Sequence, residues 1–460
     1  MLGLTALWRL RYAPLDFYAE QHQRQGDCAR IRLGPYRLWL LFHPREIEAL
    51  LTDCASDFVR FERPMRVLAQ WNGQSLLIQE GDAWRARRRY VLPVFARRRM
   101  ARYAERSVAQ AARLAQSWAA RCGPDGGVML DSDREMAGLA LDIALDAMFG
   151  RQTEAQREAI ARAVAIFSDV AYSETAGLWR TPLWQPFGRG PEKRWAMQTM
   201  DRLVTQMIEE RLAAPRDEAG DLLSMLLDGD PHKARDDAVT LLIAGHETNG
   251  AALCWLGHLL AQNPEVLAQV HAEVDTVLQG RPAVLDDHEQ LLVLRAALNE
   301  ALRLFPPAYA LFPRRALRDT QVGEAKISRN DLVVLTPWVT HRDPRWFEAP
   351  AAFSPRRFLA PPAWPAYAYF PFGAGPRSCI GQQVGLVEIT LAMATLLQDF
   401  TPQPTAGPVA AAVDAAFQLG ALNPSHYAHL SETQPAPRQV VDLKGFNQVA
   451  GDMSGLFASL

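Results

Sequence analysis

Most of the chain between Asp82 and Glu273 carries apolar residues at three- and four-residue spacing, as in the segments GLALDIALDAMFG and MDRLVTQMIEERL. This spacing places the apolar side chains on one face of an α-helix, and such faces must be buried against one another. The pattern therefore predicts a mainly α-helical protein with a minor β-sheet region.

Strand-like sequence is concentrated in two places. The segment ARIRLGPYRLWLLF (29–42) has two β-rich runs around Gly34-Pro35, which predicts a hairpin, and Pro44 then marks the start of a helix. A second mixed region, at about 313–360, holds short runs such as DLVVLTPW between Pro-rich turns. After about Thr401 the chain is rich in Ala, Pro and Gln, and we expect no strand there.

Charge and cysteine content exclude several classes of protein. The 460-residue chain has Lys+Arg 49 against Asp+Glu 51, so it has no overall attraction to nucleic acid. An odd number of scattered cysteines argues against a disulfide framework or a CxxC metal site. The five are Cys28, Cys54, Cys122, Cys254 and Cys379.

The N-terminal sequence MLGLTALWRLRYAP is interrupted by Arg9 and Arg11, and no stretch approaches the roughly 20 apolar residues that cross a bilayer. We therefore expect no integral membrane segment and a cytoplasmic protein. Peripheral membrane contact is the alternative, through Leu2, Leu4, Leu7 and Trp8. No phosphate-binding loop and no GxGxxG after a strand occurs, so a nucleotide-binding domain finds no support.

The segment from Phe372 to Gly381, FGAGPRSCIG, is the most informative in the chain. Its glycines and proline predict a tight turn around Cys379, with backbone N–H groups converging on the sulfur, and a helix follows from Gln382. A thiolate at the start of a helix is stabilised by the helix dipole and by amide donors, which suits a metal ligand. Taken alone, a structural cysteine in a Gly-rich loop would be the more common explanation.

The same segment resembles the haem-binding loop of the cytochrome P-450 family. The residues that match together are Phe372, Gly375, Arg377, Cys379 and Gly381, and the resemblance extends from about Tyr12 to about Phe400. It implies a triangular prism of helices that encloses haem b, with Cys379 as the axial iron ligand. We expect one such domain over residues 1–430, with β-containing parts at about 12–75 and 313–360, and a C-terminal extension of unknown role at 431–460.

A second match to the family is Glu300-Ala-Leu-Arg303, within the helical run VLRAALNEALRLF. An i,i+3 pair alone is usually a weak surface contact. Here it is followed by the turn His341-Arg-Asp-Pro344 and by FSPRRF at 353–358. The resemblance implies that Glu300, Arg303 and Arg357 form a buried structural triad behind the haem loop. Arg356 stands where the family often has Glu, at a position expected to face solvent.

The third match is Ala244-Gly245-His246-Glu247-Thr248, inside the apolar run VTLLIAGHETNGAALCWLGHLL. A glycine beside polar residues is unfavourable in a buried helix, which favours a functional kink or pocket. The resemblance implies that Thr248 hydrogen-bonds the oxygen that haem activates and that Glu247 relays protons. His246 points about 100° away from its neighbours, so we interpret it as a surface or core histidine.

Cations are needed for the haem propionates. Trp84 and Arg88 lie four residues apart on one predicted helix face and match the family's WxxxR motif. The resemblance implies that both bind a propionate, and it places Arg315, in PRRAL, at the other propionate site. Arginine is suited to such pairs because its guanidinium binds carboxylates bidentately.

The resemblance implies a monooxygenase that inserts one atom of dioxygen into a lipophilic small molecule. The chain has no flavin or iron–sulfur domain, so electrons must come from a separate ferredoxin or flavodoxin with its reductase, and NAD(P)H acts only indirectly. We expect a monomer with no nucleic-acid partner. A peroxygenase driven by hydrogen peroxide, a haem-thiolate isomerase and a non-catalytic haem sensor are the alternatives.

Two groups of residues are candidates for recognition. Apolar candidates for the substrate pocket are Leu76, Leu77, Ile78, the stretch from Phe167 through Trp179 and Trp184, Ile243, Ala244 and 308–312, although core packing explains each nearly as well. A basic stretch is a candidate docking site for an acidic redox partner, or else a solvated helix face. It contains Arg85, Arg87, Arg88, Arg89, Arg97, Arg98, Arg99 and Arg102.

Overall fold

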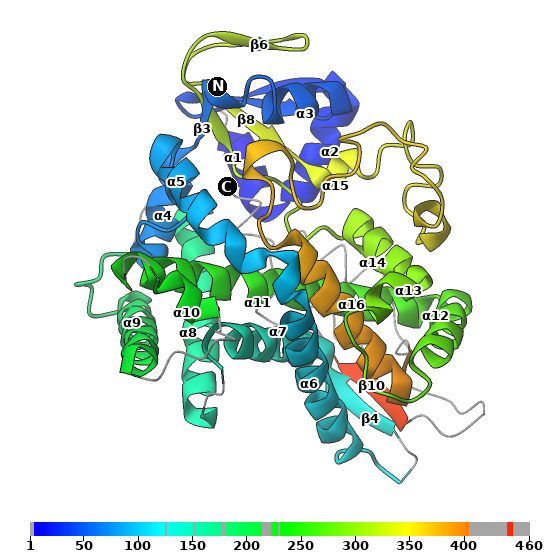
Figure 1. Cartoon of the computed structure of the whole chain (residues 1–460). Helices are drawn as coiled ribbons and strands as arrows, with labels where there is room; N and C mark the ends of the chain where they lie inside the picture. The colour runs from blue at the N-terminus through cyan, green and yellow to red at the C-terminus, as the bar shows by residue number, and fades with distance from the viewer. Residues whose placement is uncertain are drawn as a thin grey trace.

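A computed structural model describes residues 4–124, 127–150, 153–176, 181–213, 222–228, 231–403 and 439–444. Helices dominate these residues, as the periodicity predicts (Figure 1). The α-helices are α1 (Leu4–Tyr12), α2 (Pro14–Gln25), α3 (Pro44–Leu51), α4 (Glu62–Asn72), α5 (Gly81–Val91), α6 (Met100–Ala119), α7 (Ser132–Phe149), α8 (Glu154–Ala176), α9 (Gly190–Ala213), α10 (Leu222–Leu226), α11 (Pro231–Gln262), α12 (Pro264–Leu278), α13 (Asp287–Gln290), α14 (Leu292–Leu304), α15 (Pro337–Thr340) and α16 (Gln382–Asp399). Short 3-10 turns are η1 (Ala55–Asp57), η2 (Leu92–Phe95), η3 (Arg97–Arg99), η4 (Pro355–Phe358) and η5 (Gly375–Arg377).

One five-stranded sheet joins the two strand-like regions of the sequence. Its order is β1-β2-β8-β5-β3, where β1 is Cys28–Leu33, β2 is Tyr36–Leu41, β3 is Phe58–Arg60, β5 is Arg314–Ala316 and β8 is Leu332–Leu335. The predicted hairpin is confirmed, since β1 and β2 pair antiparallel around Gly34, whose φ is +56°. Pro44 opens α3 as predicted, and the His43 ring accepts a hydrogen bond from the Arg45 N–H. A separate hairpin pairs β6 (Thr320–Val322) with β7 (Ala325–Ile327).

A second sheet was missed by the sequence analysis. It has the order β4-β10-β9, where β4 is Gly127–Asp131, β9 is Phe400–Gln403 and β10 is Gln439–Lys444. The expectation of no strand after Thr401 was therefore wrong, because β10 pairs in parallel with both β4 and β9. Strand β10 also falls within the predicted 431–460 extension, whose boundary remains a prediction.

The long helix α11 crosses the helical body and packs against α7, α14 and α16 (Figure 1). Its contact with α7 is close, since a Cβ added to Gly250 would lie 3.0 Å from the Ala137 Cα. Apolar residues of α6, α7, α11, α14 and α16 share one core, and those of α4, α8 and α9 share another with the first half of α11. The middle of α11 is thereby fixed between the two halves of the helical body.

Among the described residues, no helix is both long enough and apolar enough to span a bilayer. The cytoplasmic location stays a prediction.

Candidate functional site

The loop that carries Cys379 has a backbone only glycine can supply. Gly375 has a φ of +70°, and a Cβ added there would lie 2.1 Å from the Leu51 carbonyl oxygen. Both facts exclude a larger residue, because side chains clash in the left-handed region and cannot displace a backbone atom. The Cys379 N–H donates to the Phe372 carbonyl at 2.9 Å, which closes the loop just before α16. The predicted tight turn is confirmed.

The Cys379 side chain is accessible to solvent yet enclosed by protein. Burial raises the pKa of its thiol, while the backbone N–H groups of Gly381 and Gln382 and the Arg88 charge lower it. An accessible sulfur with amide donors and a cation beside it suits a thiolate that a metal ion holds in the deprotonated form.

Arg88, Trp84 and Arg377 meet beside this loop. The Arg88 guanidinium donates to the Ser378 carbonyl at 3.0 Å, directly before the cysteine. The Arg377 guanidinium lies 4.0 Å from the centre of the buried Trp84 ring, and that of Arg88 lies 5.8 Å from it. Three predicted site residues from two distant segments are thus brought together.

An excess of positive charge surrounds Arg377. Arg60, Arg314 and Arg377 interact with one another and share the single carboxylate of Glu80. Burial and the neighbouring guanidinium groups lower the pKa of Arg377 to about 9 and that of Arg314 to about 10. Three cations around one carboxylate are unfavourable unless further anions bind, and two propionate carboxylates would balance the group.

Arg315 does not join this group, so its predicted role is corrected. Its Nε donates to both carboxylate oxygens of Glu62 at 2.9 and 3.0 Å, and its Nη1 donates to Asn330 Oδ1 at 3.0 Å. These residues line a surface cleft that also holds Tyr36 and Arg66. Successive side chains of a strand point to opposite faces, so Arg314 is the residue of β5 that reaches Arg60. Strand alternation within PRRAL was the signal that could have distinguished the two arginines.

The predicted triad is formed, and its Glu300–Arg303 pair is buried. The Arg303 guanidinium donates to both oxygens of Glu300, at 2.7 and 2.8 Å, and Arg357 Nε donates to Glu300 Oε1 at 3.0 Å. Arg303 also donates to the carbonyls of His341, Pro350 and Ala352. Both Arg303 and Glu300 have no exposed surface, so the triad is a structural group within the described fold.

The middle of α11 opens on one side. Ala244 is exposed although Ile243, His246 and Glu247 around it are buried, and a Cβ added to Gly245 would meet nothing within 4 Å. An exposed alanine and an unfilled glycine midway through a core helix indicate a hollow beside the helix. Together with the accessible sulfur and the excess cations, this hollow fits a flat apolar group that carries two carboxylates, as haem does.

Three successive polar residues of α11, His246, Glu247 and Thr248, point in three directions. The Thr248 hydroxyl donates to the Ala244 carbonyl at 2.6 Å, so it stays beside the open part of the helix. Glu247 is buried and contacts the Ser168 hydroxyl of α8. His246 is a core histidine, one of the two predicted outcomes, and burial lowers its pKa to about 4.

Asn249 links α11 to α16. Its amide donates to Glu388 Oε2 at 3.0 Å, and burial raises the pKa of Glu388 to about 8. A Cβ added to Gly385 would lie 3.2 Å from Asn249 Oδ1, so the two helices approach closely here. Glu388 was not among the residues predicted from the sequence.

The predicted pocket residues have mixed outcomes. Leu77, Ile78 and Phe312 are half-buried, as residues lining a hollow would be, and Ala244 is exposed. Phe167 instead belongs to the core, where its ring lies 5.0 Å from that of Trp71. Trp184 is 79% exposed on the surface, and Trp179 lies outside the described residues.

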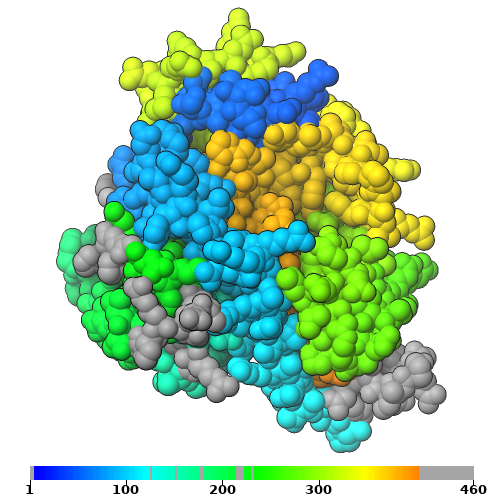
Figure 2. Space-filling model, viewed as in Figure 1, coloured from blue at the N-terminus to red at the C-terminus, as the bar shows by residue number. Residues whose placement is uncertain are grey.

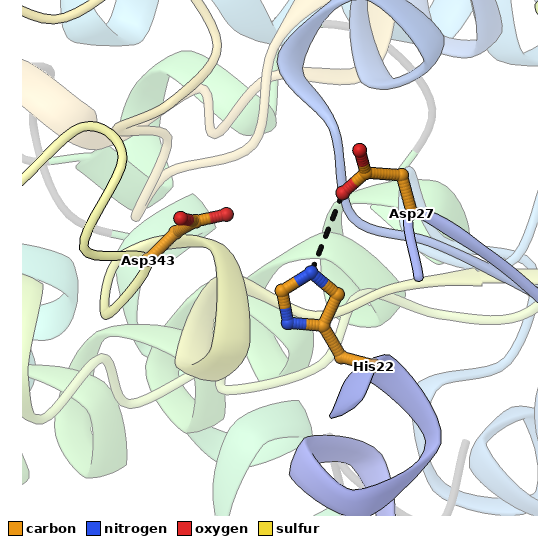
Figure 3. A group of neighbouring side chains, drawn as sticks. All are labelled: His22, Asp27 and Asp343. Carbon is orange, nitrogen blue, oxygen red and sulfur yellow. Dashed lines mark hydrogen bonds and ion pairs between the residues drawn. The ribbon is translucent and has the colours of Figure 1, made fainter. Parts of the chain in front are cut away.

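His22, Asp27 and Asp343 form a possible metal cluster elsewhere, drawn in Figure 3. The His22 ring lies 3.3 Å from Asp27 Oδ1. Arg345 already supplies the cation, since it donates to Asp27 at 2.8 Å and through Nε to both oxygens of Asp343 at 3.0 Å. The group therefore joins two segments through Arg345: Asp27, directly before β1, and Asp343, in the turn after α15.

Comparison with known proteins agrees with this geometry. The family model described as Cytochrome P450 matches residues 2–424. The chain belongs to the cytochrome P450 family. Two relatives from Streptomyces melanosporofaciens are cyclooctatin synthase, 31% identical over 86% of both chains, and cyclooctat-9-en-7-ol 5-monooxygenase, 32% identical over 88% of both. Cytochrome P450 4V2 of Rattus norvegicus is 30% identical over 83% of this chain and 78% of its own.

Membership identifies the chain as an oxidoreductase that incorporates oxygen and uses haem. The helical fold with a small β region is the fold of this family.

Glu388 should make stability depend on pH. Its pKa is about 8 in the folded protein against 4.5 for an ordinary Glu, so the folded state keeps a proton that the unfolded chain has lost. Stability should therefore fall as pH rises from about 5 to about 8, by a few kcal/mol at most. We expect Glu388→Gln to flatten this dependence of stability on pH, measured from urea unfolding curves recorded at several pH values. Glu105→Gln, at an exposed position of α6, is the control and should keep the parent slope. A Glu388→Gln slope equal to the parent's would refute the assignment.

Proposed function

We propose that this protein uses haem b, held between Cys379 and α11, to insert one atom of dioxygen into a lipophilic small molecule. Electrons come from a separate ferredoxin or flavodoxin with its reductase, so NAD(P)H acts only through that reductase. The observation that carries the proposal is the accessible but enclosed Cys379 sulfur, in a glycine-shaped loop with Arg88 beside it.

Each end of the haem has matching residues in this chain. The Cys379 thiolate would hold the iron, with Phe372, Arg377 and Gly381 shaping its loop. Arg60, Arg314 and Arg377 would hold the propionates together with Trp84 and Arg88, and Arg314 takes the role first given to Arg315. Ala244 and Gly245 would leave room for the macrocycle on the α11 side.

Haem supplies the oxidising power when bound, and the protein supplies position and protons. Thr248 and Glu247 are the residues that we assign to proton delivery. The Thr248 hydroxyl, held by the Ala244 carbonyl, keeps its lone pairs free to accept a hydrogen bond from water. Glu247 is a buried acid one residue away, placed to give and regain a proton.

The apolar lining favours a lipophilic substrate such as a terpenoid or a fatty acid. Leu77, Ile78 and Phe312 are half-buried, and Ala244 adds a small apolar surface. Two relatives carry names that refer to cyclooctatin and cyclooctat-9-en-7-ol. A screen for compounds that shift the spectrum of the ferric haem would identify the substrate.

Replacing Cys379 with His should abolish the red-shifted carbon monoxide difference band of the family and remove oxygenation, because the thiolate ligand is lost. Cys54→Ser, at a half-buried cysteine beside Gln321, is the control and should keep the band. An unchanged band in Cys379→His would refute the ligand assignment.

Replacing Thr248 with Ala should uncouple the reaction while leaving haem binding intact. Proton delivery needs a donor within about 2.6–3.2 Å, directly or through one water. We expect reduced cofactor to be consumed at a comparable rate while product falls and hydrogen peroxide rises; Glu247→Gln should slow overall turnover.

If Thr248→Ala forms as much product per electron as the parent does, Thr248 is a packing residue with no role in proton delivery. Turnover of the parent with hydrogen peroxide alone, at the rate of the full redox chain, would favour a peroxygenase. No product under any electron supply would favour a sensor.

The redox partner is proposed to dock on the face where α5, η2 and η3 border the Cys379 segment. Figure 2 shows the light-blue surface of residues near 80–100 beside the orange surface near 370–380. Arg89, Arg97 and Arg98 are exposed there. Arg87 is removed from the predicted docking group because it is buried and paired with Asp237.

Electron transfer from an acidic ferredoxin should slow as salt rises, since screening shortens to about 10 Å at 0.1 M ionic strength. Changing Arg97 and Arg98 to Glu should lower the rate and its salt dependence. Arg121→Glu, at an exposed site beyond α6, is the control. A rate that responds neither to salt nor to the charge reversals at Arg97 and Arg98 would exclude docking here.

A further inference from the structure

Ser168 is a fully buried residue of α8 that contacts the acid of α11. Its hydroxyl lies 3.0 Å from the Val164 carbonyl of its own helix and also contacts Glu247 Oε1. A serine hydroxyl carries one proton and two lone pairs. It therefore cannot donate to both oxygens at once, although it can donate to the Val164 carbonyl while it accepts from a protonated Glu247.

The two arrangements of this proton match the two states of Glu247. When Glu247 is ionised, the hydroxyl donates to the carboxylate, and the Val164 carbonyl keeps its helical hydrogen bond. When Glu247 is protonated, its own O–H donates to Ser168, and the serine proton turns to the Val164 carbonyl. In both states the Glu247–Ser168 hydrogen bond is kept, which matters because an unsatisfied buried polar group costs about 1–3 kcal/mol.

We propose that Ser168 is a positioning residue that holds Glu247 in one place while this acid gains and loses a proton. The inference rests on the proton-delivery role given to Glu247 in the proposed function. A hydroxyl suits this task better than a lysine or arginine would, because a cation stabilises only the ionised carboxylate.

Helix α8 is held firmly enough to keep Ser168 in place. Further along it, Glu174 accepts from the buried Lys193 ammonium of α9 at 2.6 Å and from Gln70 of α4 at 3.1 Å. Lys193 also donates to Gln70 Oε1 at 2.8 Å, and its side chain has no exposed surface. On the side nearer Ser168, the Phe167 ring packs against Trp71. These contacts tie α8 to α4 and α9, so the Ser168 hydroxyl meets Glu247 at a fixed position.

The test uses Ser168→Ala, with Ser173→Ala as a matched control. Ser173 lies on the same helix and donates to the Val170 carbonyl at 3.0 Å. Infrared difference spectra between the parent and Glu247→Gln isolate the carboxyl bands of Glu247 without any turnover. We expect Ser168→Ala to move these bands, with the protonated C=O stretch at higher wavenumber because a hydrogen-bond partner is lost. Ser173→Ala should leave them unchanged.

Turnover supplies the second measurement. Ser168→Ala should slow overall turnover several-fold, as Glu247→Gln does, with KM for substrate unchanged. In a Glu247→Gln background the same substitution should have no further effect, because Ser168 acts through Glu247. A serine that only supports the fold would lower the rate equally in both backgrounds.

Three results would each overturn the inference. The infrared bands could stay in place in Ser168→Ala, or they could shift equally in Ser173→Ala. The losses of turnover could also be additive in the variant that combines Ser168→Ala with Glu247→Gln. Absence of oxygenated product from the parent would instead overturn the proposed function, and the infrared bands would still report whether Ser168 binds Glu247.

Discussion

The paired hydrogen bonds between Arg303 and Glu300 hold the framework on which the Cys379 loop depends. Two buried charges are costly unless every donor and acceptor is used, and here nearly all are. Arg303 reaches the His341 carbonyl at 2.8 Å, and the His341 ring accepts from the Phe370 N–H at 2.9 Å. Two residues on, the Phe372 carbonyl accepts from the Cys379 N–H. A continuous series of contacts therefore runs from the buried ion pair to the sulfur.

The arginines around Glu80 are arranged differently from the balanced pair of Arg303 and Glu300. Arg60, Arg314 and Arg377 are crowded around Glu80, and their mutual repulsion with burial lowers the pKa of Arg377 and Arg314. The protein maintains this unfavourable group by stacking Arg377 on Trp84 and by hydrogen bonds to the Gln79 carbonyl. Such a site gains stability when anions bind, so haem and fold should stabilise each other.

Local signals predicted the parts of the fold that depend on neighbouring residues. Turn glycines predicted the Gly34 hairpin, and the Gly375 turn follows from the glycines and proline before Cys379. The triad and the α11 motif came from resemblance to a family, since spacing alone allows an exposed pair at Glu300 and Arg303. Contacts between distant segments could not be predicted: β10 is a strand because β4 and β9 lie on either side of it.

The error at Arg315 has a similar cause. Adjacent residues of a strand face opposite sides, and pairing with β3 and β8 decides which side each faces. In this sheet Arg314 pairs with Arg60 and Val333, while Arg315 pairs with Val59 and Leu332. The sequence PRRAL shows both arginines, but the register depends on pairing with distant strands and cannot be read from it. Likewise, nothing in the basic stretch distinguishes Arg87, which is buried by its pairing with Asp237 on α11, from its exposed neighbours.

One turn of α11 joins three parts of the molecule because consecutive helical residues point about 100° apart. Glu247 contacts Ser168 on α8, and Asn249 donates to Glu388 on α16, the helix that begins just after Cys379. Thr248 lies between them and is held by the Ala244 carbonyl at the open part of the helix. Both flanking contacts use neutral partners, a hydroxyl and an amide. Neutral partners fix the position of this turn without committing either acid to its charged form, and the proton-delivery role proposed for Glu247 requires that freedom.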